Sequence, residues 1–327
     1  MIPFTADAAR AVASVGEAGV IARIRGWLGE GVSPPPPRGI GDDCAVLPGA
    51  REGARLVTVD SVVWGRHFDA SVPARAAGAK LVRRNLSDIA AMGGAPADAV
   101  LALVCGGDVA LEWLGAFFEG VGAACRAFGV ALCGGDVAGA PPGFFSASLA
   151  LTGFARRPLL RGGGRAGDVL LVTGALGGSL LGRHVDFAPR LEEGRWLAAR
   201  PQVRAGMDLT DGLAKDARAL LPAGVDACLD LEKVPVSAAA FELAGGRREA
   251  ALAHALGDGE DYELLILAAA DALDTLCADW AASFPALALT PIGRLVETPP
   301  GGAGGRLLDA ATGEPLCANL RGFDHFA

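Results

Sequence analysis

Carboxylates recur along the chain, each just after a strand-like or turn-forming stretch. The motifs GIGDD, VTVD, NLSD, CGGD, MDLTD and GDGED supply Asp42, Asp43, Asp60, Asp88, Asp136, Asp208, Asp211, Asp258, Glu260 and Asp261. Each motif alone also fits a helix cap or a turn, because Asp is common in both. Several carboxylates in one place, however, repel one another and stay partly protonated unless cations bridge them.

The chain offers no competing set of metal ligands. Its histidines are scattered without the spacing of zinc ligands, at His67, His184, His254 and His325. Its seven cysteines form no C-x-x-C pair and have mostly small or apolar neighbours, which favours reduced packing residues over metal ligands or disulfides. Mg²⁺ prefers carboxylate and phosphate oxygens. The acidic motifs therefore indicate chemistry on phosphate groups with Mg²⁺.

The charge balance excludes one class of partner. The formal net charge is −8 and no block of Lys or Arg occurs, so a nucleic-acid partner is not expected. An acidic protein still binds phosphate ligands where divalent cations mediate the contact. The N-terminus has no basic region followed by an apolar core, and no apolar run approaches the roughly 20 residues of a membrane span. We therefore expect a cytoplasmic protein with no membrane partner.

Common phosphate-binding signatures are missing from the sequence. It contains no G-x-x-x-x-G-K-[ST] motif and no H-R-D or D-F-G pair of a protein kinase. The stretch LLVTGALGGSLLG imitates a dinucleotide-binding loop, but it reads G-x-x-G-G and lacks the acidic residue expected about 20 positions further on. NAD binding is therefore not favoured.

The order of elements indicates two domains of mixed α/β or α+β type, since 327 residues exceed the usual size of one core. In the first half, helices are predicted at 17–28, 74–92 and 111–128, and strands at 44–47, 55–63, 97–105, 130–136 and 144–155. In the second half, helices are predicted at 175–185, 238–243 and 270–280, strands at 167–174, 225–231, 262–268 and 288–296, and a turn with a helix at 206–221. The basic, glycine-rich stretch 153–165 marks the boundary, so the predicted domains are 1–153 and 154–327.

A set of stretches, in order along almost the whole chain, carries a resemblance to one family. They are GIGDDCAVL, VTVDSVVWGRHF, AKLVRRNLSDIAAMGGAP, CGGD, LLRGGGRAGDVLLVTG, MDLTDGLAKD, GEDYEL and the terminal GFDHF. In spelling and order the chain resembles the thiamine-monophosphate kinases, of the superfamily that includes aminoimidazole ribonucleotide synthetase. The resemblance implies direct transfer of the γ-phosphoryl group of ATP, the co-substrate, to thiamine monophosphate, with several Mg²⁺ ions.

The resemblance also implies a fold and an assembly. The fold is aminoimidazole ribonucleotide synthetase-like, with an α+β N-terminal domain followed by an α/β C-terminal domain. The strands of the N-terminal domain are expected to pair with those of a second subunit in a dimer β-barrel. We therefore expect a homodimer whose site lies in the cleft between the domains.

The matching positions imply roles for single residues. Mg²⁺ would be held by Asp43, Thr58, Asp60, Asp88, Asp136, Asp208 and Asp211. The nucleotide would contact Asp43, Thr58, Val59, Asp60, Gly135, Asp136, Arg161 and Thr210, with Val59 acting only through its backbone. His67, Glu260 and Phe323 would face thiamine monophosphate. No protein nucleophile is expected, because an oxygen of the substrate phosphate attacks and the protein positions groups and stabilises charge.

Ordinary structural roles stand beside these assignments. Asp88 also fits an acid on a helix surface, His67 an interface histidine, and Phe323 a residue of the core. Asp42 is interpreted as a turn or supporting carboxylate beside Asp43. The second CGGD stretch, which ends at Asp108, is interpreted as a helix cap.

Several positions depart from the family pattern. Val59 and Val137 stand where the family usually has Thr, Asp258 stands where Gly is usual, and Leu320 replaces a common aromatic residue. The stretch before Asp208 is shorter than in the family by roughly ten residues, about three helical turns, which would shift the following acids. Two alternatives therefore stay open: a superfamily member with another acceptor, and a non-catalytic relative that binds nucleotide and a phosphorylated small molecule.

Overall fold

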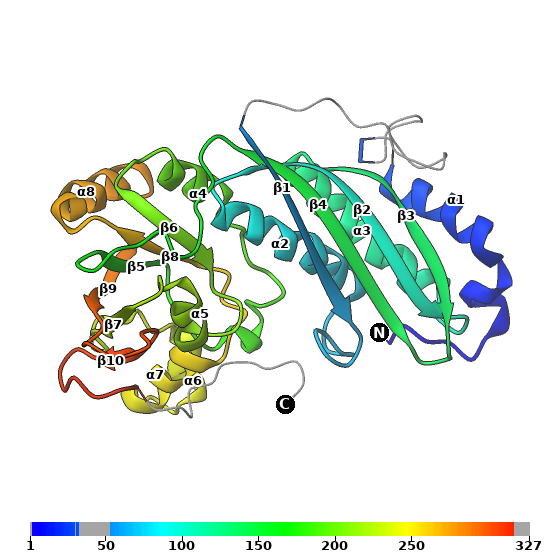
Figure 1. Ribbon diagram of the computed structural model, residues 1–327. Coiled ribbons are helices and arrows are strands. Elements are labelled where there is room, and N and C mark those ends of the chain that lie inside the picture. The colour runs from blue at the N-terminus through cyan, green and yellow to red at the C-terminus, as the bar shows by residue number, and fades with distance from the viewer. Residues whose placement is uncertain (1, 30, 33–52, 317–327) are drawn as a thin grey trace. The chain divides into compact units, whose positions relative to one another are not determined.

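The computed structural model describes residues 2–29, 31–32 and 53–316. Contacts between residues divide the chain into two compact units. Met1–Ile89 and Ala95–Arg156 form the first unit, and Ala90–Gly94 and Arg157–Ala327 form the second. The short segment Ala90–Gly94 belongs to the second unit, although its first two residues are the last two of the long helix α2, Ala74–Ala91 (Figure 1).

The first unit is built on a four-stranded sheet in the order β1-β4-β2-β3. The strands are β1 Ala54–Val63, β2 Ala95–Gly106, β3 Ala131–Ala140 and β4 Phe145–Ala155. Strand β4 pairs antiparallel with both β1 and β2, and β3 pairs parallel with β2. Every second residue of β4 is buried, which is the pattern of a sheet with one covered face.

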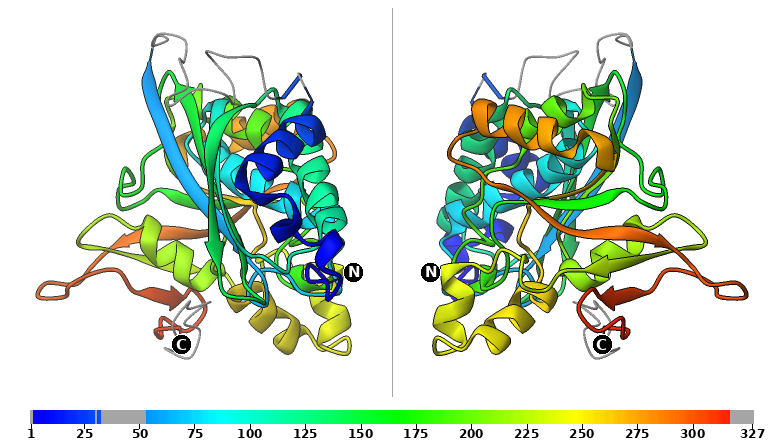
Figure 2. Two further views of the ribbon diagram at one scale, coloured as in Figure 1. Left: turned by 90° about the vertical axis from the view of Figure 1, so that its right-hand side faces the viewer. Right: turned by 90° about the vertical axis from the view of Figure 1, so that its left-hand side faces the viewer.

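Helices cover one side of this sheet. They are α1 Gly16–Leu28, α2 Ala74–Ala91 and α3 Leu111–Phe128, and Figure 2 shows them together on that side. An aromatic cluster joins α3 to the sheet, since the rings of Trp113 and Phe117 lie edge to face against Phe145 of β4, at centroid distances of 4.8 and 5.2 Å. All three side chains are buried. This packing fixes the helical layer against the strands.

The second unit is built on a six-stranded sheet in the order β10-β7-β9-β5-β8-β6. The strands are β5 Val169–Thr173, β6 Val203–Asp208, β7 Val225–Leu229, β8 Leu264–Ala268, β9 Leu289–Glu297 and β10 Leu307–Asp309. The helices are α4 Leu191–Ala198, α5 Leu213–Leu220, α6 Ala238–Leu243, α7 Arg248–Gly257 and α8 Leu273–Ser283. Every residue of β5 and β8 is buried, so these neighbouring strands form the centre of the core.

Most of the long elements expected from the sequence are present. The helix predicted at 111–128 coincides with α3, and those at 17–28 and 74–92 match α1 and α2 within a residue. The predicted strands 55–63 and 144–155 correspond to β1 and β4. The predicted strand 44–47 lies outside the described residues.

The helix predicted at 175–185 is wrong. Only a 3₁₀ turn forms there, at Ser179–Leu181. Gly177, Gly178 and Gly182 have φ values of 84°, 70° and 130°, which an α-helix does not accommodate. Elements α4, α7, β6 and β10 were not predicted as such. Of the helices in the described ranges, none has the length and hydropathy needed to cross a membrane.

Candidate active site

The first group of predicted site residues lies between β1 and α2. Thr58 and Asp60 are two residues apart in the strand, and Arg84 and Asp88 are four apart in the helix, so each pair shares a face. The Thr58 hydroxyl donates a hydrogen bond to Oδ2 of Asp88. The Arg84 Nη2 atom lies 3.0 Å from Oδ1 of Asp60. Strand and helix thus bring three predicted residues together, beside Arg84, for which the sequence predicted no role.

Asp136 lies on the other face of the same sheet. The strand register links Asp136 in β3 through β2 and β4 to Ser61 in β1. Paired residues on neighbouring strands share a face, and Ser61 directly follows Asp60, so Asp136 and Asp60 point to opposite faces. Val59 also points away from Asp60 and is 66% exposed. The sheet of one chain therefore does not bring Asp136 to the group between β1 and α2.

Gly135 has a packing reason to be glycine. A Cβ atom there would lie 1.8 Å from the carbonyl oxygen of Leu101 in β2. Because that separation is far inside van der Waals contact, the missing side chain is what lets β3 approach β2 at this point. A nucleotide contact through the Gly135 backbone stays a prediction.

His67 lies in the turn that follows β1. Its Nδ1 atom accepts a hydrogen bond of 3.1 Å from the backbone N–H of Val63, and Lys80 Nζ donates to the His67 carbonyl oxygen at 3.0 Å. With Nδ1 as an acceptor, the neutral ring carries its proton on Nε2. The turn thus fixes both the position and the tautomer of the ring, whose contact with a substrate stays a prediction.

The second group forms around the turn that follows β6. Asp208 ends this strand and is 4% exposed. The backbone N–H groups of Thr210 and Asp211 both donate to Oδ2 of Asp216 in α5, at 2.9 and 3.0 Å. The Lys215 Nζ atom lies 2.7 Å from Oδ2 of Asp211. The short stretch before Asp208 has thus not prevented the strand and its turn from forming.

Glu260 reaches the same turn from a distant part of the sequence. Its backbone N–H donates to the carbonyl oxygen of Thr210, and that of Tyr262 donates to Leu209, each at 2.8 Å. Glu260 and Tyr262 both have a φ of 52°, a conformation that side-chain-bearing residues rarely adopt and that clusters at functional sites. The backbone therefore makes the predicted nucleotide residue Thr210 and the predicted substrate residue Glu260 neighbours.

The carboxyl group of Asp216 is unusually basic. Burial raises the pKa of Asp216 to about 6, against the hydrogen bonds from the turn and the positive charge of Arg161, which lower it. Arg161 is exposed, and the next residue, Gly162, donates its N–H to the carbonyl oxygen of Leu220 at the end of α5, at 3.2 Å. The predicted phosphate-binding arginine thus lies near α5 and the turn that follows β6.

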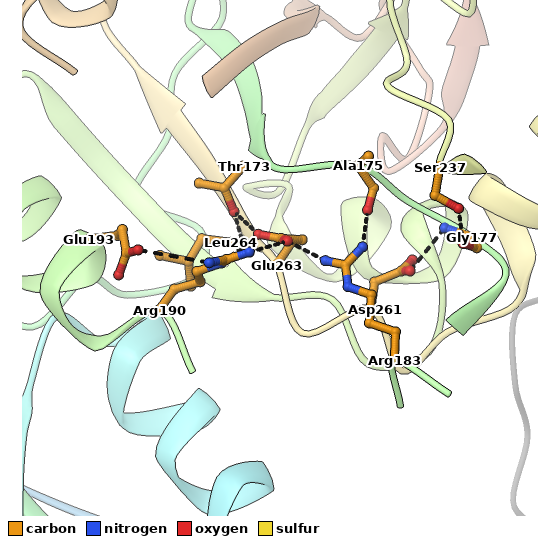
Figure 3. A network of polar contacts seen from close by, with 10 residues as sticks. All are labelled: Thr173, Ala175, Gly177, Arg183, Arg190, Glu193, Ser237, Asp261, Glu263 and Leu264. Carbon is orange, nitrogen blue, oxygen red and sulfur yellow. Dashed lines mark hydrogen bonds and ion pairs between the residues drawn. The ribbon is translucent and has the colours of Figure 1, made fainter. Parts of the chain in front are cut away.

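A buried ion network lies next to Glu260 in the chain (Figure 3). Glu263 is 1% exposed, and Arg190 approaches it with two nitrogens, Nε to Oε2 at 2.9 Å and Nη2 to Oε1 at 2.7 Å. Arg183 pairs with Oε1, and the Thr173 hydroxyl donates to Oε2 at 2.6 Å. A buried carboxylate requires such partners, and here they tie β5, β8 and the segment before α4 together.

Asp261 shares this buried surrounding. Its Oδ1 accepts a hydrogen bond of 2.9 Å from the N–H of Gly177, whereas its Oδ2 has no hydrogen-bond partner within the described residues. Burial raises the pKa of Asp261 to about 7. Burial therefore favours the protonated form of this acid.

Several supporting residues of the site were not predicted from the sequence. Asp216 had a signal, because it is an acid in the first turn of a predicted helix. Glu263 lies in the motif GEDYEL, but Arg183 and Arg190 had no signal, because they contact Glu263 from 80 and 73 positions away. Two predicted site residues, Asp43 and Phe323, lie outside the described residues.

Mg²⁺ fits these residues in its chemistry but not as a complete site. No group of three or more His, Cys, Asp or Glu within residues 2–29, 31–32 and 53–316 is arranged to hold a metal ion. Thr58 and Asp88 present oxygen atoms within hydrogen-bond distance of each other, and oxygen is the donor that Mg²⁺ prefers. Asp60 and Asp211 instead carry basic partners.

Known proteins share both the sequence and the fold. Residues 41–155 match the family described as AIR synthase related protein, N-terminal domain. A thiamine-monophosphate kinase of Rhodopirellula baltica is 38% identical over 240 residues, which is 71% of this chain and 76% of that protein.

Two solved structures cover nearly the whole chain. The crystal structure of thiamine-monophosphate kinase from Stenotrophomonas maltophilia has a TM-score of 0.73 and 32% identity, and the match covers 92% of this chain and 98% of that one. AaThiL complexed with AMPPCP and TMP has a TM-score of 0.70 and 28% identity, with 96% and 98% covered.

The fold is therefore AIR synthase-like, with mixed α/β units on two sheets, as predicted. The chain belongs to the thiamine-monophosphate kinase family and is an enzyme of this kinase class. The resemblance carried by the acidic and terminal motifs is thereby confirmed.

Proposed function

We propose that this kinase transfers the γ-phosphoryl group of ATP to thiamine monophosphate, in an Mg²⁺-dependent reaction that yields thiamine diphosphate and ADP. The observation that carries the proposal is the likeness to AaThiL complexed with AMPPCP and TMP, because it extends over 96% of this chain. AMPPCP is an analogue of a nucleoside triphosphate and TMP is a phosphorylated small molecule, so the two ligands correspond to the proposed donor and acceptor. The acidic motifs that recur along the chain are consistent with the same chemistry.

The reaction joins two polyanions and needs little covalent help from the protein. An oxygen of the acceptor phosphate forms a bond to the γ-phosphorus, and the bond from that phosphorus to the β,γ-bridging oxygen breaks to release ADP. The protein's tasks are to align the attacking and leaving oxygens and to stabilise the charge that spreads over the transferred group. No side chain is required as a nucleophile.

The residues divide these tasks between them. We assign the nucleotide to Thr58, the backbone of Val59, Gly135, Arg161 and Thr210, with Arg161 pairing with a phosphate oxygen. We assign the acceptor to His67, Glu260 and Phe323. The backbone contact between Thr210 and Glu260 supports this division, because it makes a donor-side residue and an acceptor-side residue neighbours.

Mg²⁺ would neutralise the phosphate charges that otherwise oppose the meeting of the two substrates. We assign its ligands to Thr58 and Asp88, to Asp208 and Asp211, and to Asp43, Asp60 and Asp136. The hydrogen bond from Thr58 to Asp88 supports the first pair, since it places two oxygen atoms from different elements next to each other.

The test uses the purified full-length chain with ATP and thiamine monophosphate, in the presence of MgCl₂ or of EDTA. Separation of the products by chromatography should detect thiamine diphosphate and ADP in equal amounts, and only with MgCl₂. ADP formed with a different phosphorylated acceptor, but not with thiamine monophosphate, would instead favour a superfamily member of altered specificity. Binding of AMPPCP without any turnover would contradict the proposed reaction.

We also propose a homodimer formed through the open face of the four-stranded sheet. Val57, Val59 and Val100 point to this face and are 70%, 66% and 43% exposed. The register places Val59 beside Ala150 and Ala150 beside Val100, so the three valines form an apolar patch across β1, β4 and β2, on the face that also carries Asp136. An apolar sheet face of this kind is typical of a protein–protein interface.

A further inference from the structure

The segment Arg183–Arg190 contacts the stretch Glu260–Glu263 at several points. Arg183 and Arg190, the two ends of the segment, both pair with the buried carboxylate of Glu263. Between these ends, the Nδ1 atom of His184 lies 3.2 Å from Oε2 of Glu260. The segment is thus anchored twice on one buried acid and presents a histidine to the residue that we assign to the acceptor.

A tyrosine holds the other oxygen of the same carboxylate. The Tyr262 hydroxyl donates to Oε1 of Glu260 at 3.2 Å. The ring of Phe187 stacks on that of Tyr262, with centroids 3.7 Å apart and planes at 8°. Tyr262 is 2% exposed, so this stack leaves its hydroxyl little freedom to move.

The Glu260 carboxylate is therefore oriented at both oxygens while part of its surface stays accessible. The side chains of His184 and Glu260 are 13% and 22% exposed. A carboxylate held in this way attracts a cation more strongly than a mobile one, because its orientation is set before the ligand arrives. The thiazolium ring of thiamine monophosphate carries such a positive charge.

We infer that His184 and Tyr262 are positioning residues for the acceptor, because they hold the Glu260 carboxylate in the orientation that a cationic acceptor needs. The inference rests on the proposed function, in which Glu260 faces thiamine monophosphate. It assigns to the segment Arg183–Arg190 a role in acceptor affinity and none in nucleotide affinity.

The test compares four variants of the full-length chain. His184→Ala removes the polar contact with Oε2 of Glu260, Tyr262→Phe removes the hydrogen bond to Oε1, and His184→Asn restores a donor near the position of Nδ1. His254→Ala is the matched control, because His254 Nδ1 pairs at 2.9 Å with Asp258, only two residues before Glu260. KM for thiamine monophosphate, KM for ATP and kcat are measured for each, together with AMPPCP affinity by calorimetry and the thermal unfolding midpoint.

We expect His184→Ala and Tyr262→Phe to raise KM for thiamine monophosphate about tenfold, as the loss of a hydrogen bond to a charged group predicts. AMPPCP affinity and the unfolding midpoint should stay at wild-type values. His184→Asn should recover most of the acceptor affinity, and His254→Ala should behave like the wild type.

Two results would overturn the inference. One is an unchanged KM for thiamine monophosphate in both His184→Ala and Tyr262→Phe. The other is an equal loss of acceptor and AMPPCP affinity with a lower unfolding midpoint, which marks a purely structural pair. Calorimetry of the wild type with thiamine monophosphate separates these from a failure of the proposed function, in which the wild type itself would not bind the acceptor.

Discussion

Asp88 lies in α2 and contacts Thr58 of β1. The proposed metal and nucleotide contacts of the first unit lie around this pair. The Thr58 hydroxyl donates to one carboxylate oxygen, so the acid is oriented by the strand that faces it. Substitution Asp88→Asn keeps the shape and leaves an oxygen that still accepts this bond, but it removes a negative charge. The variant therefore separates the charge of the residue from its contribution to folding.

We predict that Asp88→Asn lowers Mg²⁺-dependent formation of thiamine diphosphate by at least about a hundredfold, the usual size of a lost electrostatic contact in phosphoryl or acyl transfer. The free energy of unfolding in urea should change by less than about 1 kcal/mol. The control is Asp230→Asn, whose acid makes a surface pair with Lys233. Wild-type rates in Asp88→Asn would remove Asp88 from the site.

The raised pKa of Asp216 predicts that the stability of the folded protein depends on pH. Its pKa is raised from 3.8 to about 6 in the folded protein, mainly by burial. Between these values the folded protein retains a proton that the unfolded chain releases, so the free energy of unfolding falls as the pH rises through this window. A pKa that differs by about 2 between the folded and unfolded states corresponds to a change of roughly 3 kcal/mol in the free energy of unfolding.

Substitution Asp216→Asn should remove this component, because the amide oxygen still accepts from the turn but does not titrate. Urea unfolding of the wild type and the variant at about pH 4 and about pH 7 gives the measurement. The stability of the wild type relative to Asp216→Asn should be greater at the lower pH. Parallel pH curves for the two proteins would contradict the role given to Asp216.

Among the elements, long stretches with a clear period could be predicted from sequence and glycine-rich connections could not. Helix α3 and strand β4 each repeat their apolar residues over more than ten positions, so the face that packs in the core can be predicted from the local sequence. The stretch 175–185 also carries apolar residues, yet several of its glycines take positive φ values and only a 3₁₀ turn forms there. Strand β10 has three residues, too few for any pattern.

The site divides in the same way. The acids themselves could be recognised by type and motif, and Lys215 lies only four positions from Asp211, whereas Arg84 reaches Asp60 from 24 positions away and could not be paired with it from the sequence. The face on which Asp136 lies depends on the register of four strands, which no local pattern determines. Residue types thus follow from sequence, and their grouping follows from packing.

The junction of β2 and β3 gives a prediction for a single element. Gly135→Ala places a Cβ where the structure leaves 1.8 Å to the carbonyl oxygen of Leu101. The strands must separate there, at a cost of about 1–3 kcal/mol in the free energy of unfolding. Gly139→Ala in the same strand is the matched control, since its Cβ would meet no atom within 4 Å. Equal unfolding midpoints for both variants in urea would contradict this account.

For the whole molecule, the open sheet face predicts the assembly. The wild type should have the mass of a dimer by light scattering at micromolar concentration, and Val59→Glu should shift it to the monomer because a charge enters the apolar patch. Leu243→Glu is the control, because Leu243 in α6 is also exposed, at 44%, but lies outside this face. A monomeric wild type would argue against the proposed interface.

Strand β1 carries two sets of side chains that alternate along a single backbone. Thr58 and Asp60 face the helices, and Val57 and Val59 face outward. An insertion or deletion of one residue ahead of them would exchange the two sets, placing valines where Thr58 and Asp60 stand and exposing these two polar residues instead. Single substitutions on either face of β1 should therefore be tolerated far better than an insertion or deletion of one residue in this strand.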